Sequence, residues 1–187
     1  MIFSPNVIND GLIFCTDAAN KRSYVGSGTT VNNLMGNDSS TLVNGTAFST
    51  NKNGVFTFDG TNDYILAQTS TFGSQSFSIS MWFNATETTN NVNGYDMLFG
   101  GDGYGNASLN GLGHYIRYST DITTWVHIGS TYTQISNITN VLHTGSYHNL
   151  VLQRDYGTAW TWYLDGVYKG NNTSQDVSTD LTSQTTL

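Results

Sequence analysis

The sequence predicts an all-β protein built as an antiparallel sandwich of two sheets, and three observations support this prediction. Several segments alternate apolar and polar residues with a period of two, which places one face of each strand on a core. The composition is typical of β-proteins, with 13% aromatic but only 10% charged residues, 20 Gly and a single Pro. Turn-forming Gly, Asn, Asp and Ser separate about ten short strand-like runs, as expected for a sandwich.

The clearest predicted strand is Ser76–Asn84. Its apolar face carries four large side chains: Phe77, Ile79, Met81 and Phe83. Its other face is polar apart from one tryptophan: Ser76, Ser78, Ser80 and Trp82. An earlier segment, Val55–Asp59, repeats the alternation and places Phe56 and Phe58 inward.

Three segments near the end of the chain predict neighbouring strands. In Tyr147–Arg154 the alternation places three residues on one face of the strand: His148, Leu150 and Leu152. Thr158–Leu164 has an apolar face as well: Trp160, Trp162 and Leu164. Asp165-Gly166 then leads into Val167–Lys169. This dipeptide fits a two-residue hairpin turn, because the turn requires positive φ and Gly adopts it readily.

Weaker alternation predicts further strands at Leu12–Thr16, Tyr64–Ala67, Met97–Gly100, Tyr115–Tyr118, Trp125–Gly129 and Tyr132–Ile135. Long loops are expected at Gly26–Gly54, Thr86–Gly94, Gly101–Gly113 and Asn137–Ser146. No linker or internal repeat divides the sequence, so we expect an N-terminal arm over residues 1–10 and a single domain over residues 11–187. The arm has apolar side chains for attachment to a partner: Ile2, Phe3, Val7 and Ile8.

Charge and hydropathy exclude several functions. The chain has 6 Lys and Arg against 13 Asp and Glu, a formal net charge of −7, so it has too few cations to neutralise nucleic-acid phosphates. No stretch approaches the roughly 18 apolar residues that span a membrane. Met1–Pro5 lacks the pattern of a secretory signal, so we expect synthesis in a host cytoplasm. Cys15 is the single cysteine, and we expect a buried thiol without a disulfide.

The order and spacing of several segments carry a resemblance to a known family: Gly11–Asn20, Ser23–Thr30, Asn44–Ser49, Val55–Ile65, Phe77–Phe83, Tyr147–Leu152 and Trp162–Val167. Together they resemble laminin-G-like, concanavalin A-like jelly-roll domains of the lectin-glucanase type. The opening segment is similar to such domains in structural proteins of phages and environmental viruses. The resemblance implies a jelly-roll sandwich that serves as a non-enzymatic virion surface component, such as a capsid decoration, fibre or tail-associated protein. It also implies other virion proteins as partners and a homo-oligomer.

The chain departs from the family pattern at its C-terminal end. The family closes with a strand, a turn and an Asp-Glu-containing strand beside the first strand, whereas Asn171–Thr186 is a Ser/Thr-rich tail. The closing strands are therefore expected to be missing or supplied elsewhere. Because an unpaired strand edge invites pairing, we expect Leu12–Thr16 to pair with a tail strand or with a partner subunit.

Glycoside hydrolase or lyase activity is the weakest of three functional hypotheses. Retaining glycosidases place two carboxylates about 5–5.5 Å apart, and the glucanases of this fold class arrange them as Glu-x-Asp-x-x-Glu. Glu87 is the only Glu in the chain, so that motif is absent. The Gly-x-Ser-x-Gly motif of hydrolases is absent as well. We therefore predict a protein that is not an enzyme.

Carbohydrate binding, for adsorption to a host surface, is the alternative to a purely structural role. Sugars stack their C–H faces on exposed aromatic rings while polar groups bind their hydroxyls. The candidate rings lie in loop-rich central segments: Tyr104, Tyr118 and Trp125, with Tyr115 and Tyr132 beside them. Packing between neighbouring strands explains the same rings without a ligand.

Calcium is the one cofactor that the sequence suggests, because hard cations bind carboxylate and carbonyl oxygens from loops. A Gly-rich segment offers one set of donors: Asp96, Asp102 and Asn106. A second set follows a predicted strand: Asp59, Asn62 and Asp63. Hydrogen bonds of Asx turns explain both sets without a metal, so both interpretations stay open.

Overall fold

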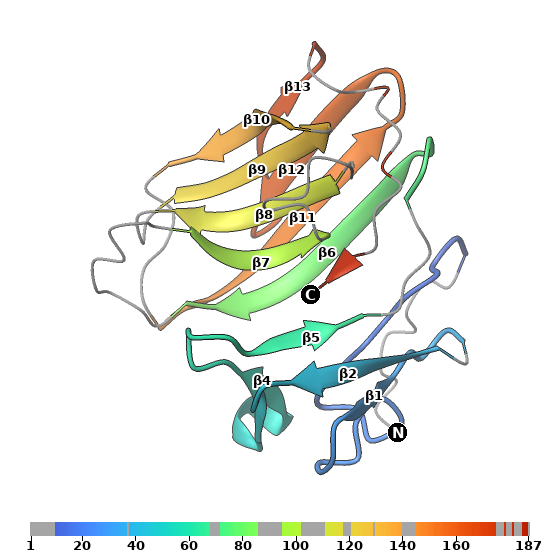
Figure 1. The fold of residues 1–187 in the computed structure, drawn as a ribbon, viewed down its shortest axis with the longest axis vertical. Coiled ribbons are helices and arrows are strands. Elements are labelled where there is room, and N and C mark those ends of the chain that lie inside the picture. The colour runs from blue at the N-terminus through green and yellow to red at the C-terminus, as the bar shows by residue number, and fades with distance from the viewer. Residues whose placement is uncertain are drawn as a thin grey trace. The chain divides into compact units, whose positions relative to one another are not determined.

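The structure is a computed structural model of the chain (Figure 1). It describes residues 10–36, 38–67, 72–85, 95–101, 111–117, 121–128, 130–139, 145–174, 178, 181 and 185–186. The chain divides into two compact units, Met1–Thr69 and Ser70–Leu187, each of which is described by itself. The described residues form strands and one 3₁₀ turn, and none of them lies in a helix long and apolar enough to cross a membrane.

The N-terminal unit contains two small antiparallel sheets. One has three strands in the order β1 (Thr30–Asn32), β2 (Ser39–Val43) and β5 (Tyr64–Leu66). The other pairs β3 (Ala47–Ser49) with β4 (Val55–Thr57), which the 3₁₀ turn Asn51–Asn53 connects. One apolar cluster stabilises this unit: Tyr24, Val31 and Leu42, packed by Phe48, Phe56 and Ile65.

The predicted strand Leu12–Thr16 is wrong, because the side chain of Asn33 takes the place of a strand partner. The backbone N–H of Cys15 donates to Asn33 Oδ1 at 2.9 Å, and Asn33 Nδ2 donates to the carbonyl of Ile13 at 3.1 Å. Leu34 N–H donates to the carbonyl of Cys15 at 2.8 Å. Cys15 is half-buried, and this burial, together with the nearby Asp17, raises the pKa of its thiol.

Two other expectations for this unit are corrected. The predicted loop Gly26–Gly54 contains β1, β2 and β3, which are short and largely polar and therefore lack a clear apolar alternation. Phe56 packs against the apolar cluster as predicted, whereas Phe58 is 51% exposed. The reason is that β4 ends at Thr57, so the alternation does not continue to Phe58.

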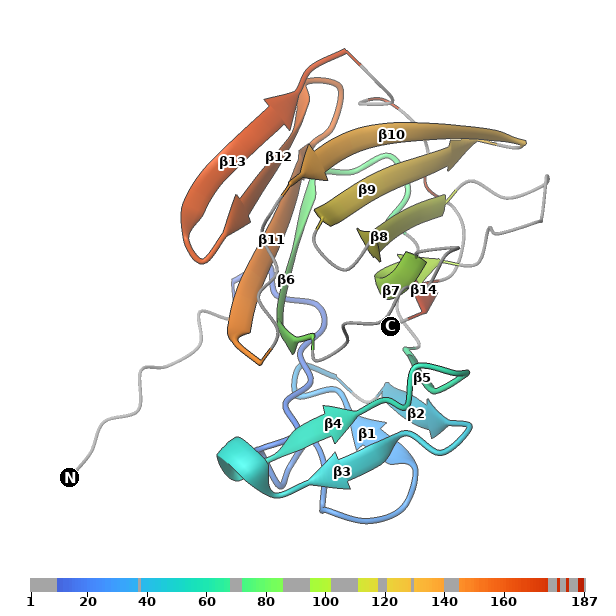
Figure 2. The ribbon, with the colours of Figure 1, turned by 90° about the vertical axis from the view of Figure 1, so that its left-hand side faces the viewer.

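The C-terminal unit is a sandwich of two antiparallel sheets (Figure 2). The four-stranded sheet has the order β13 (Val167–Asn172), β12 (Ala159–Leu164), β11 (Tyr147–Asp155) and β6 (Phe77–Asn84). The second sheet has the order β10 (Thr131–Ile138), β9 (Asp121–Ile128), β8 (Gly111–Arg117), β7 (Tyr95–Gly101) and β14 (Thr185–Thr186). The predicted two-sheet sandwich is confirmed.

The facing sides of these two sheets form one core. The four-stranded sheet contributes Leu150, Leu152, Trp160, Trp162 and Leu164. The five-stranded sheet contributes Phe99, Leu112, Ile116, Ile122, Val126, Ile135 and Ile138. At one edge the side-chain amide of Asn172 donates to the carbonyl of Ile135 at 3.3 Å and links β13 to β10. The apolar faces predicted for β6, β11 and β12 all pack into or against this core.

The turn between β12 and β13 has the predicted form. Leu164 and Val167 face each other across it, and Asp165 and Gly166 have φ values of 52° and 76°. These positive φ angles are those of a two-residue hairpin turn.

The C-terminal tail joins the five-stranded sheet. Thr185 and Thr186 pair with Gly101 and Gly100 of β7, and Leu181 forms a bridge with Gly73. The described part of the tail therefore pairs within the C-terminal unit, and the predicted pairing of Leu12–Thr16 with a tail strand or a partner subunit stays untested. Apart from Asp10, the predicted arm lies outside the described residues, and a single domain over residues 11–187 stays a prediction.

Candidate functional site

The four-stranded sheet presents one face to solvent, which we call the outer sheet face. Its side chains alternate with those of the core, and cross-strand pairing places them in rows. The first row is Ser78, Gln153, Thr161 and Asn171. The second row is Ser80, Val151, Tyr163 and Tyr168. The third row begins with Trp82 and Asn149.

Aromatic rings stand exposed on this polar face. Trp82 is 71% exposed and Tyr168 is 55% exposed. The Tyr168 ring contacts the Tyr163 ring edge-on, with centroids 5.9 Å apart, and its hydroxyl donates to Asn171 Oδ1 at 3.0 Å. Since a folded chain normally covers much of a tryptophan, an indole this open among hydroxyl and amide groups points to a binding surface.

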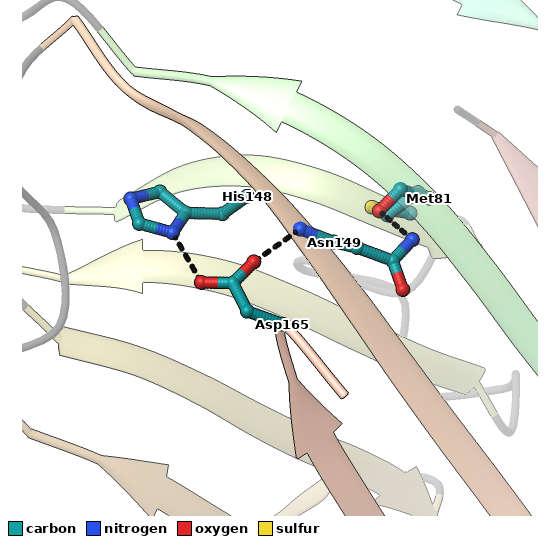
Figure 3. Close-up of polar contacts among 4 residues, drawn as sticks. All are labelled: Met81, His148, Asn149 and Asp165. Atoms are coloured by element: carbon teal, nitrogen blue, oxygen red, sulfur yellow. Dashed lines mark hydrogen bonds and ion pairs between the residues drawn. The ribbon is translucent and has the colours of Figure 1, made fainter. Parts of the chain in front are cut away.

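Asn149 places a carboxamide beside Trp82. Its Nδ2 donates to Ser80 Oγ at 3.2 Å. It also donates to the carbonyl of Met81 at 3.2 Å (Figure 3). These bonds fix the orientation of the side chain. Asn149 Oδ1 is a hydrogen-bond acceptor to which no donor of the described residues is bonded.

The turn between β12 and β13 is held against β11 next to Asn149 (Figure 3). His148 Nδ1 donates to Asp165 Oδ2 at 2.8 Å, and Asn149 N–H donates to Asp165 Oδ1 at 2.8 Å. The N–H of Asp165 returns a bond to the carbonyl of Asn149 at 2.8 Å. The hydrogen bond from His148 and that from Asn149 N–H hold the pKa of the Asp165 carboxyl below its ordinary value.

The opposite end of the outer sheet face is hollowed. The hollow has a volume of about 510 Å³ and is lined by Ser76, Phe77, Ser78, Gln153, Arg154, Asp155, Ala159 and Thr161. The hydroxyl of Ser76 accepts a bond from Tyr156 N–H at 3.0 Å and donates to Asp155 Oδ1 at 3.5 Å. Hydroxyl, amide and carboxylate groups therefore surround this hollow.

Carboxylates mark both ends of the outer sheet face, with Asp155 at the hollow and Asp165 at the turn. Arg154 is 2% exposed and turns to the other side, where its guanidinium lies 4.9 Å from the Tyr156 ring centroid and donates to the carbonyl of Gly73. Lys169 is the extra residue of a β-bulge, because Trp162 pairs with Gly170 whereas Tyr163 pairs with Tyr168. The positive charge of Lys169 contributes to the lowered pKa of Asp165.

We expect Asp165→Asn to lower the free energy of unfolding at pH 7, because the substitution removes the charge that accepts both bonds. The loss should be about 1 kcal/mol or less, since Asp165 is 46% exposed and water screens the pair. Because folding lowers the pKa of Asp165, its carboxylate stabilises the folded state fully at pH values above the unfolded pKa near 3.8. This stabilisation is lost as the pH falls through the lower pKa of the folded state. Urea unfolding of the wild-type protein and of Asp165→Asn at pH 7 and pH 3 measures this loss. A difference in the free energy of unfolding that is as large at pH 3 as at pH 7 would contradict the expectation.

The aromatic residues predicted to bind sugar are only partly brought together. Tyr115 on β8, Trp125 on β9 and Tyr132 on β10 share the side of the five-stranded sheet that faces away from the core, while Tyr104 and Tyr118 lie outside the described residues. Tyr115 is only 4% exposed. Trp125 is half-buried and its Nε1 donates to Thr123 Oγ1 at 3.3 Å, whereas Tyr132 is 41% exposed. This surface offers less open aromatic area than Trp82 and Tyr168.

The calcium and attachment predictions stay untested. Asp102, Asn106 and the apolar residues of the arm lie outside the described residues: Ile2, Phe3, Val7 and Ile8. Asp96 lies on β7 opposite Ile116, and only its backbone is described. Within the described ranges no three His, Cys, Asp or Glu side chains gather as metal ligands would.

The second predicted calcium set forms a hydrogen-bonded turn. Asp59 Oδ1 accepts a bond from Thr61 N–H at 2.8 Å, and Asp63 Oδ2 accepts one from Asp59 N–H at 3.1 Å. The carbonyl of Asn62 accepts a bond from Asn44 Nδ2 at 2.8 Å. The first of these bonds is of the Asx-turn type, and hydrogen bonds among the turn residues and with Asn44 stabilise this turn without a metal.

Two antiparallel sheets packed around one apolar core define an all-β sandwich protein. A family model described as the concanavalin A-like lectin/glucanases superfamily (Laminin_G_3) matches residues 59–187. The match covers more than half of the sequence, so the chain belongs to this family. No curated protein matches the sequence.

Several solved structures are similar to this chain at low sequence identity. The binding domain of botulinum neurotoxin serotype G is 15% identical over 82% of this chain and 39% of that chain, with a TM-score of 0.62. The carbohydrate-binding module CBM66 from Bacillus subtilis is 14% identical over 79% and 90%, with a TM-score of 0.46. The sialidase module CBM40 of Ruminococcus gnavus, bound to α2,3-sialyllactose, is 11% identical over 62% and 64%, with a TM-score of 0.48. The chain thus spans under two thirds of the Ruminococcus and neurotoxin chains.

Proposed function

We propose that this protein binds carbohydrate, without cleaving it, on the outer sheet face. The observation that carries the proposal is the exposed Trp82, at 71%, beside the fixed carboxamide of Asn149. Membership of a superfamily that includes lectins supports it.

The chemistry of the outer sheet face suits a sugar ring. A pyranose has an apolar face of C–H groups, which an open indole covers, and a rim of hydroxyls that donate and accept hydrogen bonds. Asn149 Oδ1 is an acceptor next to the indole, and the serine hydroxyls of β6 serve as donors or acceptors. Fixed polar groups around an aromatic contact provide orientation and specificity.

The spacing of carboxylates argues against hydrolysis on this face. Asp165 is bonded to the backbone of Asn149, and Asp155 lies six residues further along β11. At about 3.3 Å a residue, the two carboxyl groups are about 20 Å apart. Glycosidases hold their two carboxyl groups about 5 to 9.5 Å apart, so this pair does not serve as nucleophile and acid.

A glycan array probed with the whole labelled chain tests the proposal. We expect binding to at least one class of glycan, and no release of reducing ends when that glycan is incubated with the protein. Absence of binding to every glycan would overturn the carbohydrate proposal. Release of sugar at a catalytic rate would overturn the non-enzymatic part of it.

A place on a virion surface is a further proposal, which rests on the resemblance of the Gly11–Asn20 segment to domains of viral structural proteins. In that setting the outer sheet face serves for adsorption to host glycans. Calcium binding, attachment through the arm and homo-oligomer formation likewise stay predictions.

A further inference from the structure

We propose that the outer sheet face takes a neutral oligosaccharide that lies along β6 and β11, from Trp82 to the hollow at Asp155. The inference rests on the proposed function and specifies the length and charge of its ligand.

The length follows from the distance between the aromatic end and the polar end. Trp82 and Ser78 are four residues apart on β6, and Asn149 and Asp155 are six apart on β11. At about 3.3 Å a residue these separations are about 13 and 20 Å. One monosaccharide cannot touch both ends, whereas a chain of several sugars reaches both.

The surface between the two ends forms a continuous track. Ser80 and Val151 occupy the middle of the neighbouring strands β6 and β11 and present small side chains. Tyr163 and Tyr168 stand beside them on β12 and β13. A sugar chain that follows the strands thus lies over small side chains, with the rings of Tyr163 and Tyr168 along one side.

The charge of the ligand follows from the carboxylates. Asp155 and Asp165 stand at the two ends, and the buried guanidinium of Arg154 is turned away from the outer sheet face. Lys169 is the exposed cation described on this sheet, and its charge already acts on Asp165. The chain as a whole has a net charge of −7. The carboxylates of Asp155 and Asp165 repel the negative charges of sulfated, uronic or sialylated glycans, whereas they accept hydrogen bonds from the hydroxyls of a neutral glycan.

The first experiment measures affinity by calorimetry for a length series of the neutral glycan that binds best on the array. We expect affinity to increase until the chain reaches both ends, and then to stay constant. Gln153→Ala, at the hollow, should weaken the long ligands and leave the shortest binding member unchanged. Trp82→Ala should weaken all of them, and Trp125→Ala on the other sheet serves as the matched control.

The second experiment compares this neutral glycan with its sulfated or uronic form. We expect the acidic form to bind about tenfold more weakly at low salt, and the difference to shrink at high salt because ions screen the repulsion. Lys169→Gln should leave neutral binding unchanged.

Affinity that does not depend on length, or preference for the acidic form, would overturn this inference. In either case binding that still requires Trp82 leaves the proposed function intact. If no glycan of any length binds, the proposed function itself fails.

Discussion

Trp82→Ala is expected to weaken carbohydrate binding by about 30-fold or more while the protein stays folded. The indole is 71% exposed, so its removal costs the fold little packing. It is also the largest open apolar surface described on the outer sheet face, and truncating a tryptophan that anchors a ligand typically costs about 2 kcal/mol or more of binding free energy. That amount corresponds to about a 30-fold rise in Kd, measured by calorimetry with the glycan selected on the array.

The matched control for this variant is Trp125→Ala on the five-stranded sheet. Its indole is half-buried and bonded to Thr123, so it offers a sugar less surface. We expect Trp125→Ala to leave Kd unchanged within about twofold, and Trp82→Phe to retain part of the affinity because a ring remains. Loss of binding in Trp125→Ala but not in Trp82→Ala would assign the site to the other sheet.

Trp160→Ala is expected to have the opposite effect and to destabilise the C-terminal unit by about 3–5 kcal/mol. Trp160 is fully buried at 0% exposure, contacts the Phe77 ring edge-on at 6.0 Å, and lies 5.0 Å from the Arg154 guanidinium. Removing the Trp160 indole leaves a cavity in the core, and the buried guanidinium of Arg154 loses the ring over which it lies. A loss of this size is a large part of the roughly 5–15 kcal/mol that stabilises a typical protein.

Urea unfolding followed by tryptophan fluorescence measures this loss, because all four tryptophans lie in the C-terminal unit. Trp160→Phe should destabilise less, since it keeps a ring against Phe77. Trp82→Ala should change the free energy of unfolding by less than about 1 kcal/mol. If Trp160→Ala also proves that mild, the packing described for this core is incorrect.

The strands that could be predicted from the sequence are those in which a core imposes a period of two. In β6, β11 and β12 large apolar side chains occupy every second position, and in each strand they pack into or against the core. Asp165-Gly166 was equally informative, because few dipeptides adopt two successive positive φ angles.

Strands were wrongly predicted or missed in two situations. In one, a side chain forms the hydrogen bonds that a neighbouring strand would form; in the other, the strand is very short. Leu12–Thr16 has the composition of a strand, yet Asn33 bonds to its backbone in place of a neighbouring strand. In β1 and β2 only Val31, Ser40 and Leu42 are buried, which is too short a pattern to distinguish from a loop.

The candidate site was missed for a related reason. The alternation of β6 placed Trp82 on the polar face, but the sequence alone does not show which polar face stays open. The rings of Tyr163 and Tyr168 meet only through the pairing of β12 with β13, including its irregularity after Trp162. The rings chosen from loop-rich segments were identified by local composition, which carries no information on burial.

Nuclear magnetic resonance of the four tryptophan indole N–H groups during titration with a neutral oligosaccharide shows whether the ligand binds at Trp82. Trp82 is exposed on the outer sheet face and Trp125 is half-buried on the other sheet, whereas Trp160 and Trp162 are buried in the core, so the indoles distinguish the two surfaces from the core. We expect the Trp82 signal to shift in a saturable manner while the signals of Trp160 and Trp162 stay in place. A shift confined to Trp125, or no shift under conditions where calorimetry shows saturation, would contradict it.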